Sequence, residues 1–345
     1  MNKLRSILVT GGAGFVGSHL IERLLSRGRM IVCLDNFTNE SYSADFKRQN
    51  VVLFRGQPNF TLIEGDLRNQ TFLDKVFSEH HFESVVHLAG MAGVRLSVEK
   101  PYLYDESNIW ATINLLEECR KTPPERFVLA SSSSVYGNDN QVPFCENQLP
   151  HPVSPYGASK AAAELFCQAY YTLYGVPLTI LRFFTVFGPR QRPDMAIYKF
   201  TRAITRGEPV RLFGNGESSR DYTYVTDIVD GIEKSMSASD KGCQIFNLGS
   251  GRPVTLKHLI ETIERCVNKK AKIEFLPEQP GDVDVTLADI SKAKNMLGYN
   301  PRTTIEDGIS FFVQWYRSNY DQIKGLSRRR SSIAPRMIVD QTSIR

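Results

Sequence analysis

The feature that most constrains this chain is the stretch Ile7–Asp35, where a glycine-rich turn joins a short apolar segment to an amphipathic one. Its first four residues, Ile-Leu-Val-Thr, predict a buried parallel strand because they are apolar, few and stopped by glycine. After the glycines, leucine and isoleucine recur at helical spacing, and Gly28 is placed to end that helix. Residues 31–34 then predict a second buried strand.

The glycines of the turn favour a dinucleotide. Gly11 permits the sharp turn, Gly14 lets backbone N–H groups approach a pyrophosphate at the positive end of the helix, and Gly17 lets the helix lie close to the strand. Asp35 ends the second strand, where a carboxylate accepts hydrogen bonds from the adenosine ribose and repels a 2′-phosphate. Another α/β protein could share the glycines alone. The strand, helix and terminal acid together predict a site for NAD rather than NADP.

Composition excludes several classes of protein. The chain has 345 residues, 41% of them apolar, which suffices for one large α/β unit or two lobes. It has no apolar run of the roughly 18 residues that span a bilayer, and no signal peptide is recognisable. The six cysteines form no CxxC pair and the six histidines show no ligand spacing. We therefore expect a reduced, cytoplasmic protein with no membrane span and no metal.

The net charge of +5 does not indicate nucleic-acid binding. Residues 326–345 contain five arginines and one acid, so the other 325 residues carry only +1. A nearly neutral body offers no broad surface for phosphates. We expect this basic segment to be a disordered, solvated tail, although its Arg328–Ser332 run would also suit a kinase or an anionic surface.

Further apolar segments at residues 60–63, 84–89 and 126–130 alternate with helical patterns, and no internal repeat is present. This alternation predicts an α/β fold with a Rossmann-type, doubly wound parallel sheet. Right-handed crossovers would bring the carboxyl ends of the strands to one edge. At that edge we expect the glycine turn, Asp35, Asp66, Gly90 and Ser131.

The segment after the fifth expected strand carries the catalytic pattern. Tyr156 and Lys160 lie four residues apart, so one helical turn puts both on the same face. A tyrosine with a pKa of about 10 is a poor base; lowering that pKa by about three units requires roughly 4 kcal/mol, which we assign to Lys160 and a positive nicotinamide ring. Ser132 would donate or relay a hydrogen bond to the same substrate oxygen. Tyr320 and Lys324 share the spacing, but they have no glycine turn beside them and are interpreted as a coincidence.

From Lys3 to about Tyr320, the chain resembles the extended short-chain dehydrogenases/reductases, and among them the nucleotide-sugar 4-epimerases. The motifs that carry this resemblance are Gly11-x-x-Gly14-x-x-Gly17, Ser131–Gly137, Tyr156-x-x-x-Lys160, Leu181–Ala196 and Arg220–Val225. The resemblance implies an NAD-binding Rossmann domain (1–182), a smaller C-terminal α/β lobe that holds a UDP-sugar (183–325, with parts near 221–250 returning to the first domain) and the basic tail (326–345). It also implies a homodimer with a four-helix interface made by helices near Asn108–Arg120 and Tyr156–Tyr174.

The residues around the catalytic pattern narrow the reaction. Related sugar dehydratases carry an Asp-Glu pair, and UDP-glucuronate decarboxylases a Glu, where this chain has Ser133 and Ser134. Serine cannot act as a carboxylic acid near pH 7, which counts against dehydration and decarboxylation. Redox-neutral chemistry at one carbon is therefore favoured. Thr185, the Pro-Arg-x-Arg-Pro-Asp-Met-Ala segment and the loop 92–95 resemble UDP-glucuronate 4-epimerases. Hydroxyls would cradle the sugar carboxylate near Arg192, for which a pyrophosphate or surface contact remains an alternative.

The resemblance implies the full set of site residues. We expect NAD to contact Gly11, Gly14, Phe15, Val16, Gly17, Asp35, Asn36, Asp66, Leu67, Leu88, Ala89, Gly90, Ser131, Tyr156 and Lys160. We expect the UDP-sugar to contact Arg95, Ser132, Ser133, Ser134, Tyr156, Thr185, Arg192, Arg220 and Asp282, of which Arg220 could instead form a structural ion pair. Ser132, Tyr156 and Lys160 would be catalytic.

The implied activity is NAD-dependent 4-epimerisation of UDP-glucuronate to UDP-galacturonate through a transient 4-keto sugar, a step of polysaccharide biosynthesis. UDP-glucose or UDP-N-acetylglucosamine 4-epimerase is the main alternative. A UDP-glucuronate decarboxylase and a non-catalytic NAD-binding scaffold are weaker ones.

Overall fold

Seven parallel strands form the main sheet of this protein, whose computed structural model describes residues 5–138, 141–238, 242–277 and 285–319. The strand order is β10-β6-β5-β4-β1-β2-β3, and all neighbouring pairs are parallel. The strands are β1 (Arg5–Thr10), β2 (Ile31–Asp35), β3 (Phe60–Glu64), β4 (His81–His87), β5 (Arg126–Ser132), β6 (Leu178–Phe183) and β10 (Cys243–Leu248). The order of β1 to β6 is that of a Rossmann fold.

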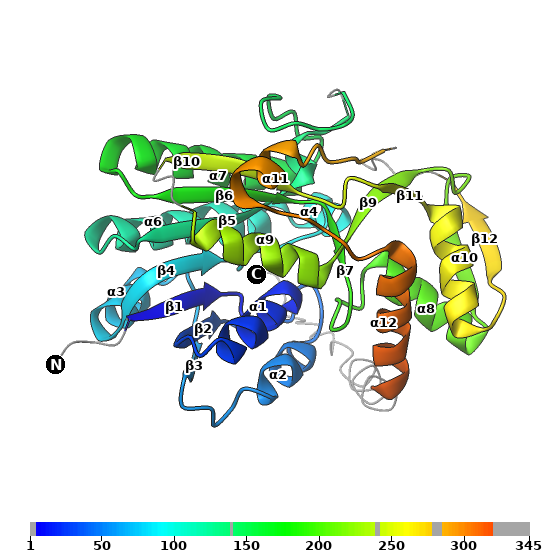
Figure 1. Cartoon of the computed structure of the whole chain (residues 1–345), viewed down its shortest axis with the longest axis horizontal. Helices are drawn as coiled ribbons and strands as arrows, with labels where there is room; N and C mark the ends of the chain where they lie inside the picture. The colour runs from blue at the N-terminus through cyan, green and yellow to red at the C-terminus, as the bar shows by residue number, and fades with distance from the viewer. Residues whose placement is uncertain (1–4, 139–140, 239–241, 278–284, 320–345) are drawn as a thin grey trace, which may run out of the picture.

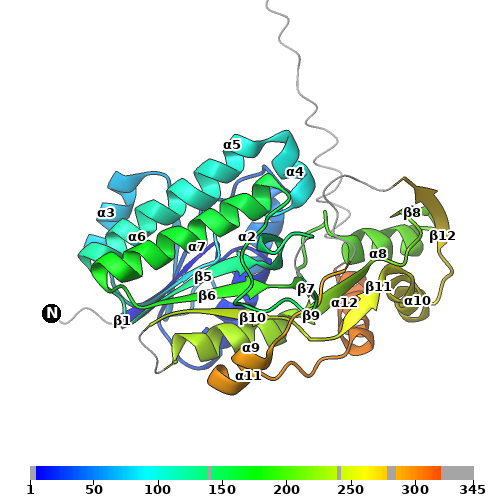
Figure 2. The same ribbon diagram turned by 90° about the horizontal axis from the view of Figure 1, so that it is seen from above.

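Helices cover both faces of this sheet, as Figure 2 shows. One face carries α3 (Gln70–Glu79), α6 (Ala111–Lys121) and α7 (Pro155–Tyr174), and the other carries α1 (Phe15–Ser26) and α9 (Val225–Met236). The burial of β1 on both faces of the sheet explains why its sequence is apolar at successive positions. Leu8 packs on the α3, α6 and α7 side, whereas Ile7 and Val9 pack on the α1 side.

A smaller lobe stands beyond the carboxyl ends of the strands, at the right of Figure 1. Its strands form the sheet β11-β9-β7 and the parallel pair β12-β8. They are β7 (Thr185–Phe187), β8 (Pro209–Phe213), β9 (Ser219–Tyr224), β11 (Pro253–Thr255) and β12 (Lys272–Leu276), with helices α8 (Ala196–Arg206), α10 (Leu256–Val267) and α12 (Ile305–Ser318). Between β9 and β11 the chain returns to the large lobe to form α9 and β10.

The remaining elements are short. They are α2 (Ala44–Val52), α4 (Val94–Glu99), α5 (Pro101–Tyr104), a π-helical turn (Asp105–Trp110), a 3₁₀ turn (Ser133–Val135) and α11 (Ser291–Leu297). Across the described parts of the chain, no helix is both long and apolar enough to cross a membrane.

The predicted fold class is confirmed, with two differences in the elements. The fourth strand begins at His81, three residues earlier than expected, and the helix expected from Asn108 starts as the π-helical turn before α6. Tyr320, Lys324 and the tail 326–345 lie outside the described residues.

A comparison of two glycines gives a prediction about stability. Gly11, in the glycine turn, and Gly28, after α1, share a left-handed backbone (φ +66° and +73°) but differ in their surroundings. A Cβ on Gly11 would lie 2.6 Å from the Ala89 amide nitrogen, whereas a Cβ on Gly28 would meet nothing within 4 Å. We expect Gly28→Ala to cost about 1 kcal/mol of unfolding free energy from backbone strain alone. Gly11→Ala should cost at least about 3 kcal/mol because backbone atoms must also shift. Urea unfolding without ligand measures both, and equal losses would contradict the close packing.

Candidate active site

A single cleft of about 1770 Å³ runs along the carboxyl ends of the strands and into the smaller lobe. Pockets for one small ligand usually enclose about 300–1,000 Å³, so this cleft has room for two. Every predicted site residue that the structure describes lines it, and Asp282 lies outside the described residues. These residues are Gly11, Gly14, Phe15, Val16, Gly17, Asp35, Asn36, Asp66, Leu67, Leu88, Ala89, Gly90, Arg95, Ser131, Ser132, Ser133, Ser134, Tyr156, Lys160, Thr185, Arg192 and Arg220.

The helix α1 presents its N-terminus to this cleft. Its N-cap is Gly14, which has no side chain to bond the first amides, and its first turn carries no acidic residue. Close packing fixes this position, because a Cβ on Gly17 would lie 2.5 Å from the Gly11 carbonyl oxygen. Exposed amides at the positive end of a helix suit a pyrophosphate.

Asp35 is held rigidly where the second strand ends. It is buried, and its carboxylate accepts hydrogen bonds from the amides of Ala13 (3.2 Å) and Phe37 (2.9 Å). Burial raises the pKa of this carboxyl, and Lys47, whose ammonium lies 4.0 Å away, opposes that rise. Lys47 was not predicted, since no motif marks a lysine of α2 as a neighbour of β2.

Asp66 and Asn36 form the next part of the cleft. Asn36 Nδ2 donates to Asp66 (3.1 Å), and Arg68 pairs with the same carboxylate (2.8 Å). The hydrogen bonds from Arg68 lower the pKa of Asp66 to about 2, so it stays ionised at neutral pH. Together with Asp35 and the α1 amides, these groups fit the adenosine and pyrophosphate parts of NAD.

Tyr156 and Lys160 lie on one face of α7. The helix starts sharply because Ser154 accepts a hydrogen bond from the Gly157 amide (3.1 Å) and Pro155 occupies its first position. Lys160 is buried, and its ammonium donates to the Ala130 carbonyl at the end of β5 (2.8 Å). Burial lowers the pKa of Lys160 to about 8.

The surroundings of the Tyr156 phenol have opposing effects on its pKa. Burial raises its pKa, while a hydrogen bond with Ser132 and the positive charge of Arg192 lower it. We expected Lys160 and a positive nicotinamide ring to supply that lowering; the Lys160 ammonium donates to the Ala130 carbonyl, and its effect on the phenol in the presence of NAD stays a prediction. The ring of Tyr104 meets the ring of Tyr156 edge-on, with centroids 6.0 Å apart.

Asn108 is a buried residue that supports the site without lining the cleft, and the sequence did not reveal it. It lies in the π-helical turn, which carries no recognisable motif. Its side chain accepts a hydrogen bond from the Met91 amide (2.7 Å) and donates to the Met91 carbonyl (3.0 Å) and to Ser159 (2.8 Å). It thereby ties the loop after β4 to α7, one residue before Lys160.

Ser131 is anchored on the inner side of the cleft. Its hydroxyl donates to Glu164, which also forms a buried ion pair with Arg182 at 2.8 and 3.0 Å. This arrangement fixes the end of β5 against α7.

The predicted substrate residues come from both lobes. Ser132 and Ser134 are joined hydroxyl to hydroxyl (3.2 Å), beside Ser133 in the 3₁₀ turn, and Thr185 begins β7. Arg95 of α4 stacks on Phe213 of β8, with the guanidinium 4.4 Å from the ring centroid. This contact bridges the two lobes.

Two further arginines line the cleft. Arg192 pairs with Asp194 and also donates to the Ala92 carbonyl (3.2 Å). Arg220 donates to the Ser219 carbonyl (3.0 Å). Asp194 was not singled out from the sequence, where it was only one letter of a family motif.

No group of three or more His, Cys, Asp or Glu side chains within the described ranges is arranged to hold a metal ion, and the six cysteines are free thiols. A Rossmann sheet with this glycine turn, this Ser-Tyr-Lys set and a second lobe over the strand ends defines an extended short-chain dehydrogenase/reductase.

Residues 8–311 match the family described as GDP-mannose 4,6 dehydratase, and the chain belongs to that family. The UDP-glucuronate 4-epimerase of Thermodesulfobacterium geofontis is 40% identical over 321 residues, which are 92% of this chain and 98% of that protein. The resemblance expected from the motifs is confirmed.

Two solved structures are similar over nearly their whole length. The UDP-glucuronic acid 4-epimerase from Bacillus cereus, in complex with UDP-glucuronic acid and NAD, gives a TM-score of 0.87 at 35% identity, covering 91% of this chain and 100% of that one. The UDP-glucose 4-epimerase of Thermotoga maritima, in a structure with UDP-glucose, gives a TM-score of 0.85 at 33% identity. The match covers 91% of this chain and 99% of that one.

The burial of Lys160 predicts how stability depends on pH. Its pKa in the folded protein, about 8, lies below the 10.5 of an exposed lysine, so between these values the unfolded chain binds more protons and stability rises with pH. Between pH 7 and pH 9.5 we expect the unfolding free energy of the wild type to rise, relative to Lys160→Met, by on the order of 2 kcal/mol. Urea titrations of both proteins at the two pH values measure this difference. A difference that does not change with pH would show that the lysine is not buried as described.

Proposed function

We propose that this protein is an NAD-dependent UDP-sugar 4-epimerase that interconverts UDP-glucuronate and UDP-galacturonate. The observation that carries the proposal is the pair Ser133 and Ser134, which stands beside Ser132, Tyr156 and Lys160 in the cleft without a carboxylic acid for dehydration or decarboxylation. The relatives named for UDP-glucuronate support the choice of sugar.

The cofactor is NAD. When bound, it accepts and returns the hydrogen of the sugar C4 as hydride. The amides at the start of α1 would hold its pyrophosphate, Asp35 its adenosine ribose and Lys160 its nicotinamide ribose.

Tyr156 performs the proton transfer. As a phenolate it removes the proton of the C4 hydroxyl, and as a phenol it returns a proton to the same oxygen after the sugar has turned over. Ser132 donates a hydrogen bond to that oxygen. Burial raises the pKa of Tyr156, and against it the hydrogen bond with Ser132 and the positive charge of Arg192 favour the phenolate.

The hydroxyls beside the phenol would protect the substrate from losing its carboxylate. Oxidation at C4 of glucuronate makes a β-keto acid, which releases CO₂ when its C5–carboxylate bond aligns with the ketone π system. Ser133, Ser134 and Thr185 would hold that bond out of alignment by fixed hydrogen bonds, which requires positioning but no acid or base.

A neutral sugar is the second candidate. The similarity to the Thermotoga maritima UDP-glucose 4-epimerase favours it, as does the pairing of Arg192 with Asp194. Anomeric proton NMR of the purified enzyme with UDP-glucuronate, UDP-glucose and UDP-N-acetylglucosamine separates the candidates. We expect epimerisation of UDP-glucuronate without CO₂ release, and product from the neutral sugars alone would contradict the proposal.

The role of Tyr156 gives a kinetic prediction. Tyr156→Phe removes the base but keeps the ring, so turnover should fall at least about 100-fold. The dissociation constant of UDP-glucuronate, measured by calorimetry, should change by less than tenfold because most contacts of the nucleotide remain. Unchanged turnover would indicate a different base and revive the idea of a non-catalytic scaffold.

We infer the domain functions and location from the same set of observations. Residues 1–182 would bind NAD, residues 183–325 the UDP-sugar, with the segment near 221–250 packing on the first domain. Free cysteines support a cytoplasmic location, and we infer a role in polysaccharide biosynthesis.

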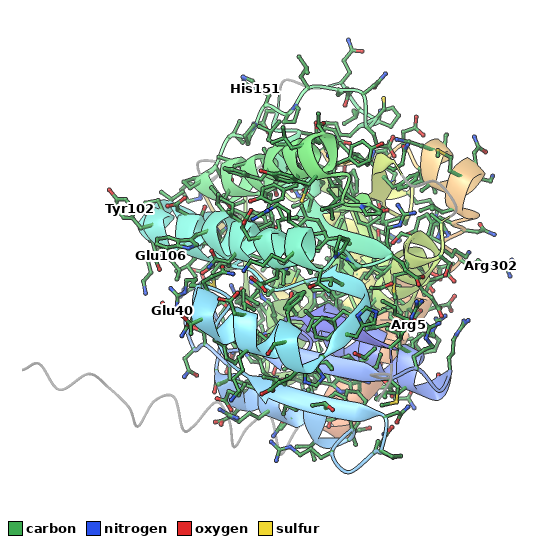
Figure 3. All side chains as sticks on the ribbon, turned by 90° about the vertical axis from the view of Figure 1, so that its left-hand side faces the viewer. Arg5, Glu40, Tyr102, Glu106, His151 and Arg302 are labelled. Atoms are coloured by element: carbon green, nitrogen blue, oxygen red, sulfur yellow. The ribbon has the colours of Figure 1, made fainter. Side chains whose placement is uncertain are left out.

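A homodimer through α6 and α7 is part of this proposal. Large apolar side chains are exposed on these helices and the turns beside them, including Leu165 (63% exposed), Trp110 (58%) and Tyr102 (82%). Tyr102 projects outward near Glu106 at the margin of Figure 3. Exposed apolar surface of this kind marks protein interfaces.

Leu165→Asp tests the dimer. A buried carboxylate at a two-fold interface would be unpaired and repelled by its copy, so we expect a monomer near 39 kDa by light scattering instead of a dimer. Phe311→Asp, at an exposed position of α12 (49%), is the matched control and should leave the dimer intact. A wild-type monomer would refute the interface.

A further inference from the structure

Arg192 and Asp194 form an ion pair inside the cleft, two residues apart in one loop. Arg192 Nε lies 3.0 Å from Asp194 Oδ1, and Nη2 lies 2.5 Å from Oδ2, so the pair is bidentate. Nη2 also donates to the Ala92 carbonyl, and the guanidinium lies 5.9 Å from the centroid of the Tyr42 ring. The charge of Arg192 is therefore already engaged by a carboxylate of the protein itself.

A sugar carboxylate that used Arg192 would need the same kind of contact that Asp194 makes. Bidentate pairs between a guanidinium and a carboxylate are stronger than hydrogen bonds between neutral groups. A uronate can therefore replace Asp194, charge for charge, whereas the C6 hydroxyl of a neutral hexose cannot. The ion pair of the free protein therefore affects the binding of uronates and of neutral hexoses differently.

Lys199 offers Asp194 a second partner. It lies on α8, lines the same cleft and is exposed. Partial desolvation lowers its pKa, Asp194 raises it, and the charges of Arg95, Arg202 and Arg192 lower it. Among the described residues, no ion pair within 4.0 Å involves the Lys199 ammonium, so it is available if Asp194 leaves Arg192.

We propose that Asp194 is a specificity-determining residue that occupies Arg192 in the free protein and yields it to the carboxylate of a uronate substrate, turning towards Lys199. This inference rests on UDP-glucuronate as the substrate. It adds a built-in competitor that a uronate must displace, so Asp194 lowers the affinity for UDP-glucuronate and leaves that for UDP-glucose nearly unchanged.

A purely orienting role for Asp194 makes the opposite prediction. If the ion pair served only to aim Arg192 at the substrate, removal of Asp194 would weaken the binding of UDP-glucuronate. If Asp194 competes for Arg192, its removal strengthens that binding. The direction of the change therefore separates the two roles.

The test is Asp194→Asn, made in the NAD-loaded Tyr156→Phe protein so that ligands bind without turnover. Asparagine keeps the shape but cannot form the charged pair. By calorimetry we expect the dissociation constant of UDP-glucuronate to fall about tenfold, which corresponds to about 1.4 kcal/mol. That of UDP-glucose should change by less than twofold.

Two further variants complete the design. Glu233→Gln is the matched control, because Glu233 also pairs with an arginine, Arg27, at 3.0 Å but neither residue lines the cleft; it should change neither dissociation constant by more than twofold. Lys199→Met should weaken UDP-glucuronate more than UDP-glucose, since it removes the second partner of Asp194.

Weaker binding of UDP-glucuronate to Asp194→Asn, or an equal change for both ligands, would overturn the proposal. These results leave the proposed function intact if the wild type still epimerises UDP-glucuronate. A wild-type protein that binds UDP-glucose alone would overturn both.

Discussion

The parallel direction of the seven strands is the constraint on which the rest of the structure depends. Parallel strands share one edge for all their carboxyl ends, and each connection that leaves this edge contributes to the cleft. The glycine turn follows β1, Asp35 ends β2, the loop of Gly90 follows β4 and Ser132 ends β5. The smaller lobe needs only to cover this edge in order to enclose two ligands.

The site concentrates buried charge, which opposes stability. Lys160 is held by a single carbonyl, Asp35 by two amides, and Glu164 by Arg182 and Ser131. Buried charges are costly unless hydrogen bonds compensate them. The partners of Lys160 and Glu164 lie on β5 and β6, and those of Asp35 lie in the glycine turn and just after β2. The same contacts that make the charges tolerable also fix their positions for catalysis.

Much of the fold could be predicted from local sequence patterns, whereas the site could be predicted less completely. Apolar runs and glycine turns are local signals, so they identified the Rossmann strands and the residues at their ends. Lys47, Asn108 and Asp194 became visible only in three dimensions, because their partners come from other segments or depend on side-chain direction. The spacing of Tyr156 and Lys160 gave their shared face correctly, but it could not tell that the ammonium turns to Ala130.

The central claim is that Tyr156 removes the proton of the C4 hydroxyl while NAD takes the C4 hydrogen as hydride and returns it to the same carbon. The most direct measurement uses UDP-glucuronate deuterated at C4, with mass and NMR analysis of the product. The account predicts that the deuterium stays at C4 with inverted configuration and that conversion is slowed by an isotope effect when chemistry limits the rate. Loss of the label to water would contradict it, because the hydrogen would then leave as a proton by another route.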